Sequence, residues 1–145
     1  MMMLNKNLTP VYTDAYISIA VDFSTSFLQS TWLTHPDAQQ FMAGFQRVAD
    51  LVKQNKIKYW LSDSRQLLYL DKASQNWMKN IMLPQSKDSV LLKYARIVSP
   101  ETLNSFDTED IFNYMDNHPE FFRPIQIGVF TSVYQALSWI EIETT

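Results

Sequence analysis

Apolar residues change their spacing repeatedly along this chain, from every second residue to every third or fourth and back again. In residues 15–22, Ile17, Ile19 and Val21 alternate with Tyr16, Ser18 and Ala20, which is typical of a half-buried strand. From residue 34 to about 55 the apolar positions follow a helical period instead. Because strands alternate with helical segments, we expect helical crossovers and a largely parallel sheet.

The same reasoning places elements along the rest of the chain. Strands are expected at residues 15–22, 27–33, 57–63, 91–99 and 125–130. Helices are expected at residues 34–55, 71–84 and 108–115, and from Thr131 toward the C-terminus. Thr34 and Thr131 are the expected caps of the first and the last helix, and Ala73, Trp77 and Ile81 are expected to face inward in the second. The predicted fold is α/β, with a mostly parallel sheet of about five strands, an antiparallel edge strand and about four helices.

Composition predicts a single folded domain. The chain has 145 residues, of which 46% are hydrophobic and 14% aromatic, and no long stretch is too polar to fold. We therefore expect one domain over residues 1–145, with residues 1–12 as a loosely ordered N-terminal segment. No segment has the apolar run of a signal peptide or of a membrane span, which predicts a cytoplasmic protein.

Composition also disfavours several classes of function. A formal net charge of −3 argues against a nucleic-acid partner. With no cysteine and only two glycines, the chain cannot form a thiolate metal site, a Walker loop or a dinucleotide loop. Neither His35 nor His118 has a second ligand at the spacing of a helical zinc site. We therefore expect neither a cofactor nor a metal.

Four segments, taken in order, resemble a known family. They are "YWLSDSRQL" from residue 59, "QNWMKNIMLP" from residue 75, "ARIVSPE" from residue 95 and "FTSVYQALSWI" from residue 130. Their order and spacing are similar to those of the SpoIIAA-like, or STAS/SEC14-like, domain family, especially its small stand-alone bacterial members of unknown function. The resemblance implies a non-enzymatic binding or regulatory module that associates into a homodimer.

The resemblance does not extend to the phosphorylation site of that family. In the members that antagonise anti-sigma factors, a strand ending in aspartate leads to an Asp-Ser-Ser-Gly turn that holds the phosphorylated serine. Here Asp63 ends the strand and Asp71 follows at the family's spacing (71 − 63 = 8), but Lys72 and Ala73 stand where the family has its two serines. The scaffold is therefore expected without the phosphorylation switch.

Polar side chains follow the predicted parallel strands at the point where each strand ends. In an open α/β sheet, ligands bind where the carboxyl ends of the strands meet the helix N-termini. The candidate rim for a ligand or a protein partner comprises Thr34, His35, Asp63, Ser64, Arg65, Ser99, Glu101, Thr131 and Ser132. Arg65 can pair with Asp63 and order the turn, or it can hold an anion.

Two further interpretations of these residues stay open at the level of sequence. Asp63, Ser64 and His35 supply the residue types of a hydrolase or transferase, although Ser64 lacks the glycine-flanked elbow of a nucleophile and such residues are far more often helix caps. The aromatic residues predict a packed core, or else the walls of a pocket that carries a small apolar ligand.

Overall fold

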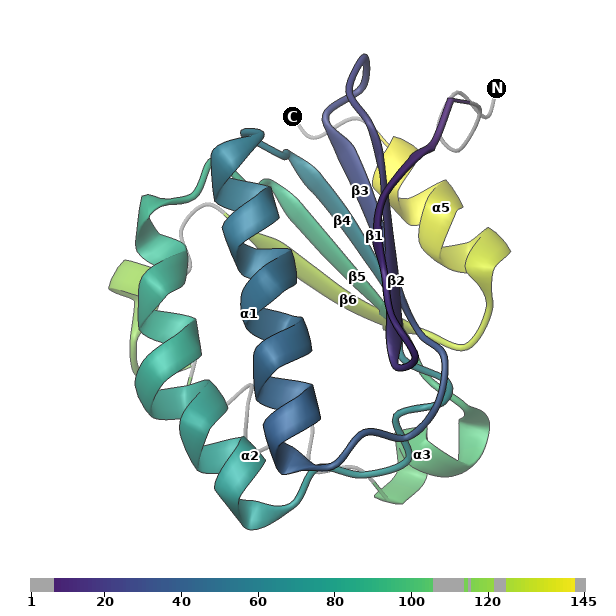
Figure 1. Ribbon diagram of the computed structural model, residues 1–145. Coiled ribbons are helices and arrows are strands. Elements are labelled where there is room, and N and C mark those ends of the chain that lie inside the picture. Colours follow the sequence, from purple (N-terminus) through teal and green to yellow (C-terminus); the bar gives the residue numbers. More distant parts are fainter. Residues whose placement is uncertain (1–6, 106–113, 115, 122–124, 143–145) are drawn as a thin grey trace.

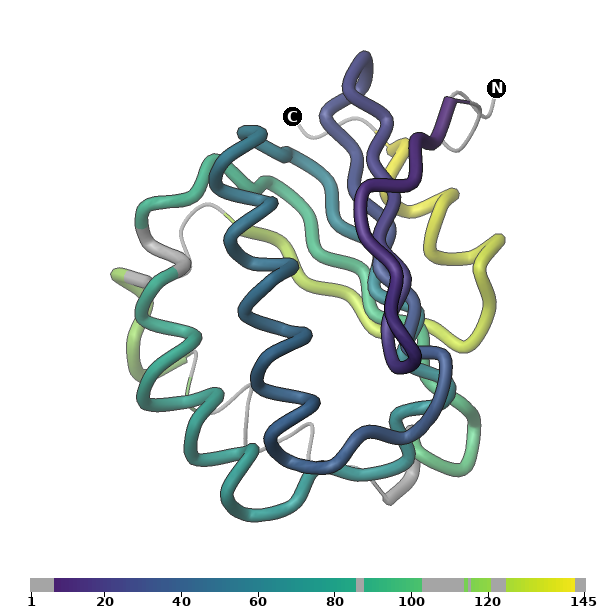
Figure 2. Tube along the Cα trace, in the orientation of Figure 1, coloured from purple at the N-terminus to yellow at the C-terminus, as the bar shows by residue number. Residues whose placement is uncertain are grey.

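Six strands pair side by side in the order in which they occur in the chain (Figures 1 and 2). The computed structural model describes residues 7–105, 114, 116–121 and 125–142. The strands are β1 (Thr9–Thr13), β2 (Ile17–Asp22), β3 (Phe27–Trp32), β4 (Tyr59–Asp63), β5 (Lys93–Ile97) and β6 (Gln126–Phe130).

The sheet is mixed, with its antiparallel part at one edge. β1 pairs antiparallel with β2, and β2 with β3, whereas β3, β4, β5 and β6 are parallel to their neighbours. In this register Thr31 pairs with Asp63, Asp63 with Ile97, and Ile97 with Phe130. The carboxyl ends of the four parallel strands therefore meet at one edge of the sheet, which confirms the predicted parallel arrangement.

The sheet has one strand more than the five expected. β1 lies largely within residues 1–12, which were predicted to be loosely ordered, and the described part of that segment is instead paired with β2. Its residues are mostly exposed, so no pattern of buried positions marks it in the sequence. Tyr12 is the exception, because the guanidinium of Arg47 lies 4.0 Å from its ring centroid and attaches the strand to the first helix.

Helices cover both faces of the sheet (Figure 1). Helix α1 (Ala38–Gln54) and helix α2 (Lys72–Trp77) lie on one face, and α5 (Val133–Glu141) lies on the other. α2 continues without a break into a π-helical turn (Met78–Met82) and a 3₁₀ segment (Leu83–Asp88). We call residues 72–88 the roof segment. The short helix α3 (Pro100–Ser105) follows β5, and a 3₁₀ turn spans Pro119–Phe121.

Each face of the sheet has its own apolar core. Under α1 and the roof segment, the buried residues include Ile19, Leu28, Trp60 and Met78. Under α5, a smaller cluster surrounds Leu61 and includes residues of β5 and α5. Strand alternation sends neighbouring residues of β4 to opposite cores.

Two helix caps differ from those expected. α1 is capped by Asp37, not by Thr34: its carboxylate accepts a hydrogen bond from the amide of Gln40 at 2.8 Å, and the Gln40 side chain accepts one from the amide of Asp37 at 2.9 Å. This reciprocal capping box is a stronger start than a threonine that lies before Pro36. α5 is likewise capped by Ser132, one residue after Thr131.

The inward face of the roof segment also differs from the prediction. Of the three residues expected to face inward, Trp77 does pack against the core, where its ring meets Phe41 and Phe45 edge-on. Ala73 is exposed and Ile81 is 51% exposed, and the fully buried positions are instead Ser74, Met78 and Met82. Ser74 tolerates burial because Asp71 accepts hydrogen bonds from both its hydroxyl and its amide, the latter at 2.7 Å.

One further predicted helix cannot be compared with the structure, and one observed helix was not predicted. The predicted helix at residues 108–115 lies almost wholly outside the described residues. α3 occupies residues for which the sequence predicted only the end of a strand at Pro100. A proline suits the first turn of a helix as well as the end of a strand, so this boundary is ambiguous from sequence.

Gly44 allows α1 to lie close to the sheet. A Cβ atom at this position would lie 2.7 Å from Cη2 of Trp32, which is 3% exposed and stacks on Phe41. Alanine is the better helix former by about 1 kcal/mol, but overpacking a core costs about 1–3 kcal/mol. We therefore predict that Gly44→Ala lowers the free energy of unfolding by about 1 kcal/mol in urea titrations. In a Trp32→Phe background the same substitution should stabilise the protein, and equal destabilisation in both backgrounds would contradict the proposed contact.

A buried lysine holds the C-terminal end of α5. The Nζ atom of Lys93, a residue only 2% exposed, donates to the carbonyl oxygens of Trp139 at 2.8 Å, Ile140 at 3.3 Å and Ile142 at 2.6 Å. These carbonyls lie at the end of the helix, where carbonyls run out of regular helical partners, and that of Trp139 also accepts from the amide of Ile142 at 3.3 Å. Burial lowers the pKa of Lys93 from its ordinary value. The ammonium is nevertheless well placed, because it meets the negative end of the α5 dipole.

We predict that Lys93→Met destabilises the protein by about 1–3 kcal/mol, because a side chain of similar length leaves buried carbonyls without donors. Lys58→Met is the matched control, since Lys58 precedes β4 and is exposed. That control should stay within about 0.5 kcal/mol of the parent chain in urea titrations. Equal effects of the two substitutions would show that the capping contacts of Lys93 contribute nothing.

Candidate ligand cavity and the strand-end rim

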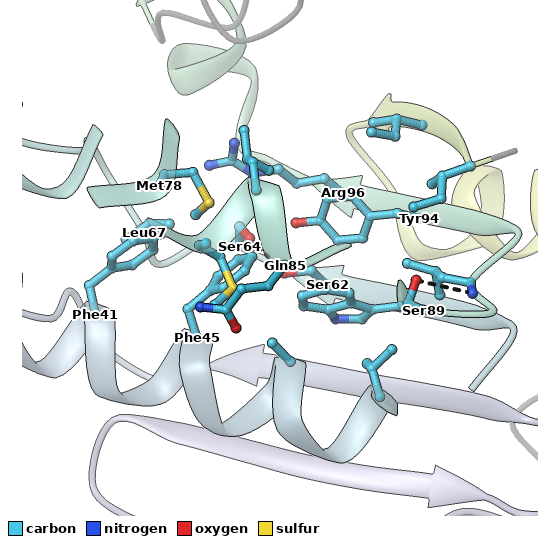
Figure 3. Close-up of a pocket in the computed structure, with 18 of the residues that line it drawn as sticks. Phe41, Phe45, Ser62, Ser64, Leu67, Met78, Gln85, Ser89, Tyr94 and Arg96 are labelled. Carbon is cyan, nitrogen blue, oxygen red and sulfur yellow. Dashed lines mark hydrogen bonds between the residues drawn. The ribbon is translucent and has the colours of Figure 1, made fainter. Parts of the chain in front are cut away.

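A cavity of about 150 Å³ lies between the sheet and the layer formed by α1 and the roof segment (Figure 3). Figure 3 shows Phe41 and Phe45 reaching into it from α1, with Met78 contributed by the roof segment. β4 and β5 supply further lining residues, and Ile127 and Val129 of β6 complete the sheet side. The cavity therefore lies under the helices, over the middle of the parallel strands.

The roof of this cavity is an irregular helix. At its π-helical turn the amide of Leu83 donates to the carbonyl of Met78, five residues earlier, so the helix widens beside the cavity. Such turns occur often at functional sites. Met78 and Met82 both line the cavity, and methionine side chains adapt to irregular space better than branched ones. The roof is thus the part of the wall best suited to adjust to a ligand.

Aromatic rings form much of the remaining wall. The ring centroids of Phe45 and Trp60 are 5.2 Å apart, and those of Trp60 and Tyr94 are 4.5 Å apart. The indole N–H of Trp60 donates to the hydroxyl of Ser30 at 2.9 Å, so its polar atom has a partner beneath the ring. These rings present apolar faces to the cavity.

The sheet side of the cavity carries several polar groups, and Lys53, Gln85 and Ser89 supply others from outside the sheet. Ser62 and Tyr94 line it together with Ser64 and Arg96, and Ser62 pairs with Arg96 in the β4–β5 register. The Ser62 and Ser64 hydroxyls are hydrogen-bonded at 3.0 Å. Burial raises the pKa of the Tyr94 hydroxyl, and a hydrogen bond with Ser62 partly offsets that rise. Burial also lowers the pKa of Arg96. All four groups thus face a water-poor space.

The rim residues Asp63 and Arg65 pair with each other. Two nitrogens of the Arg65 guanidinium, Nε and Nη2, donate to the two carboxylate oxygens of Asp63 at 2.9 and 2.6 Å. Asp63 is 8% exposed, and this bidentate pair compensates its charge and raises the pKa of Arg65. Of the two roles open to Arg65, the structure therefore shows the one that orders the turn.

Two rim serines begin helices. The Ser99 hydroxyl accepts a hydrogen bond from the amide of Thr102 at 3.2 Å and donates to its hydroxyl at 2.7 Å, which starts α3. The Ser132 hydroxyl accepts from the amide of Gln135 at 3.1 Å, which starts α5. Thr131 lies between β6 and that cap and is half-buried. These serines use their hydroxyls as caps of the ordinary kind.

His35 lies in a second, wider hollow between the starts of α1 and α2. Its ring contacts that of Tyr69 in a tilted arrangement with centroids 4.4 Å apart, and its Nδ1 accepts a hydrogen bond from the amide of Leu68 at 3.2 Å. The carboxylates in this hollow, Asp37 and Asp71, cap the two helices. Hydrogen bonds from Ser74, with His35 nearby, lower the pKa of Asp71. The polar side chains of this hollow therefore accept hydrogen bonds from nearby backbone amides.

The three residue types of a hydrolase triad therefore belong to three different sets of contacts. Ser64 is hydrogen-bonded to Ser62 beside the cavity, Asp63 is paired with Arg65, and His35 is hydrogen-bonded to a backbone amide in the other hollow. Asp63 and Ser64 are also consecutive at the end of a strand, which sends their side chains toward opposite faces of the sheet. Of the rim residues, only Ser64 lines the cavity.

Sequence reasoning missed the polar residues of the cavity that lie within strands. Tyr94 and Arg96 alternate with buried residues of β5, and Ser62 precedes Asp63 in β4. A signal was available, because an arginine inside a predicted buried strand is uncommon. The rule that ligand residues follow parallel strands predicted a site at the strand ends instead.

The described residues offer neither a metal site nor a membrane-spanning helix. In the part of the chain that the structure describes, no cluster of three or more metal-ligating side chains is present. Within the same residues, none of the helices has both the length and the apolar character needed to cross a membrane.

Comparisons of the chain with protein-family models, with curated proteins and with solved structures found no match.

Proposed function

We propose that this protein is a non-enzymatic binding or regulatory module, similar to the SpoIIAA/STAS domains, which holds a small and mainly apolar molecule in the cavity beneath α1 and the roof segment. The observation that carries this proposal is the cavity itself. Protein interiors are close-packed, and unfilled space of this size within a core is uncommon. A cavity of about 150 Å³ is large enough for a benzene-sized molecule.

The composition of the cavity wall supports a ligand of this kind. Ligand sites are concave and mostly apolar, with a few polar groups that orient the bound molecule. Here Phe45, Met78 and Met82 supply apolar surface, while residues such as Ser62 and Tyr94 supply polar groups. By contrast, the contacts of the strand-end rim are those of caps and a turn.

The proposal also gives the irregular roof a role. The cavity is partly open to solvent, and part of its wall adjusts when a ligand binds. The roof segment is the best candidate, because its π-helical turn lacks the regular i→i−4 hydrogen bonding of an α-helix. Self-association into a homodimer stays a separate prediction, which sedimentation equilibrium can decide.

Toluene is a suitable first probe, and Ala49→Leu is the test variant because Ala49 of α1 lines the cavity. We predict that toluene stabilises the parent chain, by about 1.4 kcal/mol at ten times its Kd, and that Ala49→Leu abolishes this effect by filling the cavity. Ala43→Leu is the matched control, because Ala43 is an exposed position of the same helix. This control should retain the toluene effect in thermal unfolding.

Methyl resonances of methionine give a local readout of the same titration. With ¹³C-methyl labelling, the signals of Met78 and Met82 should shift on addition of toluene, because both side chains line the cavity. Met42 packs at the edge of the same core and should change little. Toluene that leaves the Met78 and Met82 signals in place, and stabilises neither the parent chain nor Ala43→Leu, would refute the proposed binding site.

A further inference from the structure

A row of hydroxyl groups lies on the sheet side of the cavity. Ser62 in β4, Ser64 directly after that strand and Tyr94 in β5 all line it (Figure 3). The hydroxyls of Ser62 and Ser64 are hydrogen-bonded at 3.0 Å, and Ser62 also forms a hydrogen bond with the Tyr94 hydroxyl. Ser62 and Ser64 are each only 2% exposed. We call the hydroxyls of Ser62, Ser64 and Tyr94 the hydroxyl row.

The hydroxyl row has one hydrogen-bond donor more than its members can use. Each hydroxyl carries one donor and has sites for two acceptor contacts. Three hydroxyls joined in a row form two hydrogen bonds with one another, so one O–H group has to donate elsewhere. Within the described ranges of the chain, these hydroxyls form no other hydrogen bond. A ligand that brings an acceptor to this buried donor is therefore favoured over one that does not.

The other polar side chains of the wall are placed differently. Gln85 donates to the carbonyl of Ile81 at 3.1 Å and accepts from the side chain of Gln46 at 3.3 Å. Lys53 is exposed, and Arg96 is half-buried with a contact of its own within the protein. The hydroxyl row is therefore the polar group best suited to orient a bound molecule.

The rings beside the hydroxyl row favour an aromatic ligand. Phe45, Trp60 and Tyr94 form a series in which neighbouring ring planes are tilted by 53° and 46°. Tilted ring pairs are favourable beyond the apolar area that they bury, and only an aromatic ligand can add further pairs of this kind. The sulfur atoms of Met78 and Met82, which also line the cavity, make favourable contacts with rings as well.

We propose that the ligand of this cavity is a small neutral phenol, whose hydroxyl bonds to the serines of the hydroxyl row and whose ring lies against Phe45, Trp60 and Met78. A phenol hydroxyl both accepts and donates, so it can take up the remaining O–H donor and use a free acceptor site of the same row. This inference rests on the proposed function, because it names the chemical class of the molecule held in the cavity. The volume of about 150 Å³ limits the ligand to about one ring.

Phenol, toluene and cyclohexanol are probes of nearly equal size that separate hydrogen bonding from shape. Phenol and toluene differ by a hydroxyl in place of a methyl group, and cyclohexanol keeps the hydroxyl on a ring that is not aromatic. A purely apolar cavity would bind toluene more tightly, because burying a hydroxyl without a partner is costly. In calorimetric titrations of the parent chain we expect phenol to have a Kd about three- to tenfold lower than toluene, as one net hydrogen bond predicts. Cyclohexanol should bind at least about threefold more weakly than phenol.

Serine variants then assign the preference to the hydroxyl row. In Ser62→Ala/Ser64→Ala the advantage of phenol over toluene should fall by about three- to tenfold, while toluene still binds. Ser64→Ala alone should lower the advantage by about threefold, and it provides the test if the double variant fails to fold. Ser18→Ala is the matched control, because Ser18 lies in β2, outside the described wall of the cavity, and it should keep the full preference.

The outcomes are distinguishable. Toluene or cyclohexanol binding to the parent chain as tightly as phenol would overturn the phenol inference while the binding cavity stands. A phenol advantage that is undiminished in the serine variants, or that falls equally in Ser18→Ala, would also overturn it. Failure of all these probes to bind the parent chain would refute both this inference and the proposed function.

Discussion

The parallel pairing of β4 with β5 is the interaction on which the rest of the structure depends. It aligns Trp60 with Tyr94 and Ser62 with Arg96, so these four side chains share the face under α1 and the roof segment. The same pairing sends Lys93 to the opposite face, where its ammonium caps α5. β5 thus places two cations in different surroundings. Lys93 donates to three carbonyl oxygens, whereas Arg96 lines the cavity on the other face. Lys93 is only 2% exposed, so its ammonium cannot be moved into water without displacing α5.

Much of the fold could be predicted from the sequence because its elements have strong periodic patterns. The long amphipathic pattern of α1 and the apolar run of β4 predicted a helical crossover between parallel strands. The parallel pairing of β3 with β4 confirms it. The misses occurred where local patterns carry little information. β1 is held by backbone pairing and by the contact between Tyr12 and Arg47, so it shows no buried alternation. The inward face of the roof segment was predicted only in part, because Ser74, which is hydrogen-bonded to Asp71, is buried, whereas the more apolar Ala73 is exposed.

The candidate site could be predicted only in part. Sequence located polar residues at the strand ends, and Ser64 does line the cavity, but Asp63 and Arg65 neutralise each other. The cavity itself depends on how far α1 and the roof lie from the sheet. That distance follows from contacts between segments far apart in the chain, such as Gly44 on Trp32, and no local pattern encodes it. A polar residue in the middle of a buried strand was the more informative signal, because it requires partners that the core must supply.

A crystal structure of the protein grown with toluene tests the central claim most directly, because it shows which space a small apolar molecule occupies. The cavity proposed as the binding site predicts ring density between Phe45 and the roof segment. Ring density in the hollow beside His35, or a cavity filled by rotated side chains with no toluene bound, would contradict it.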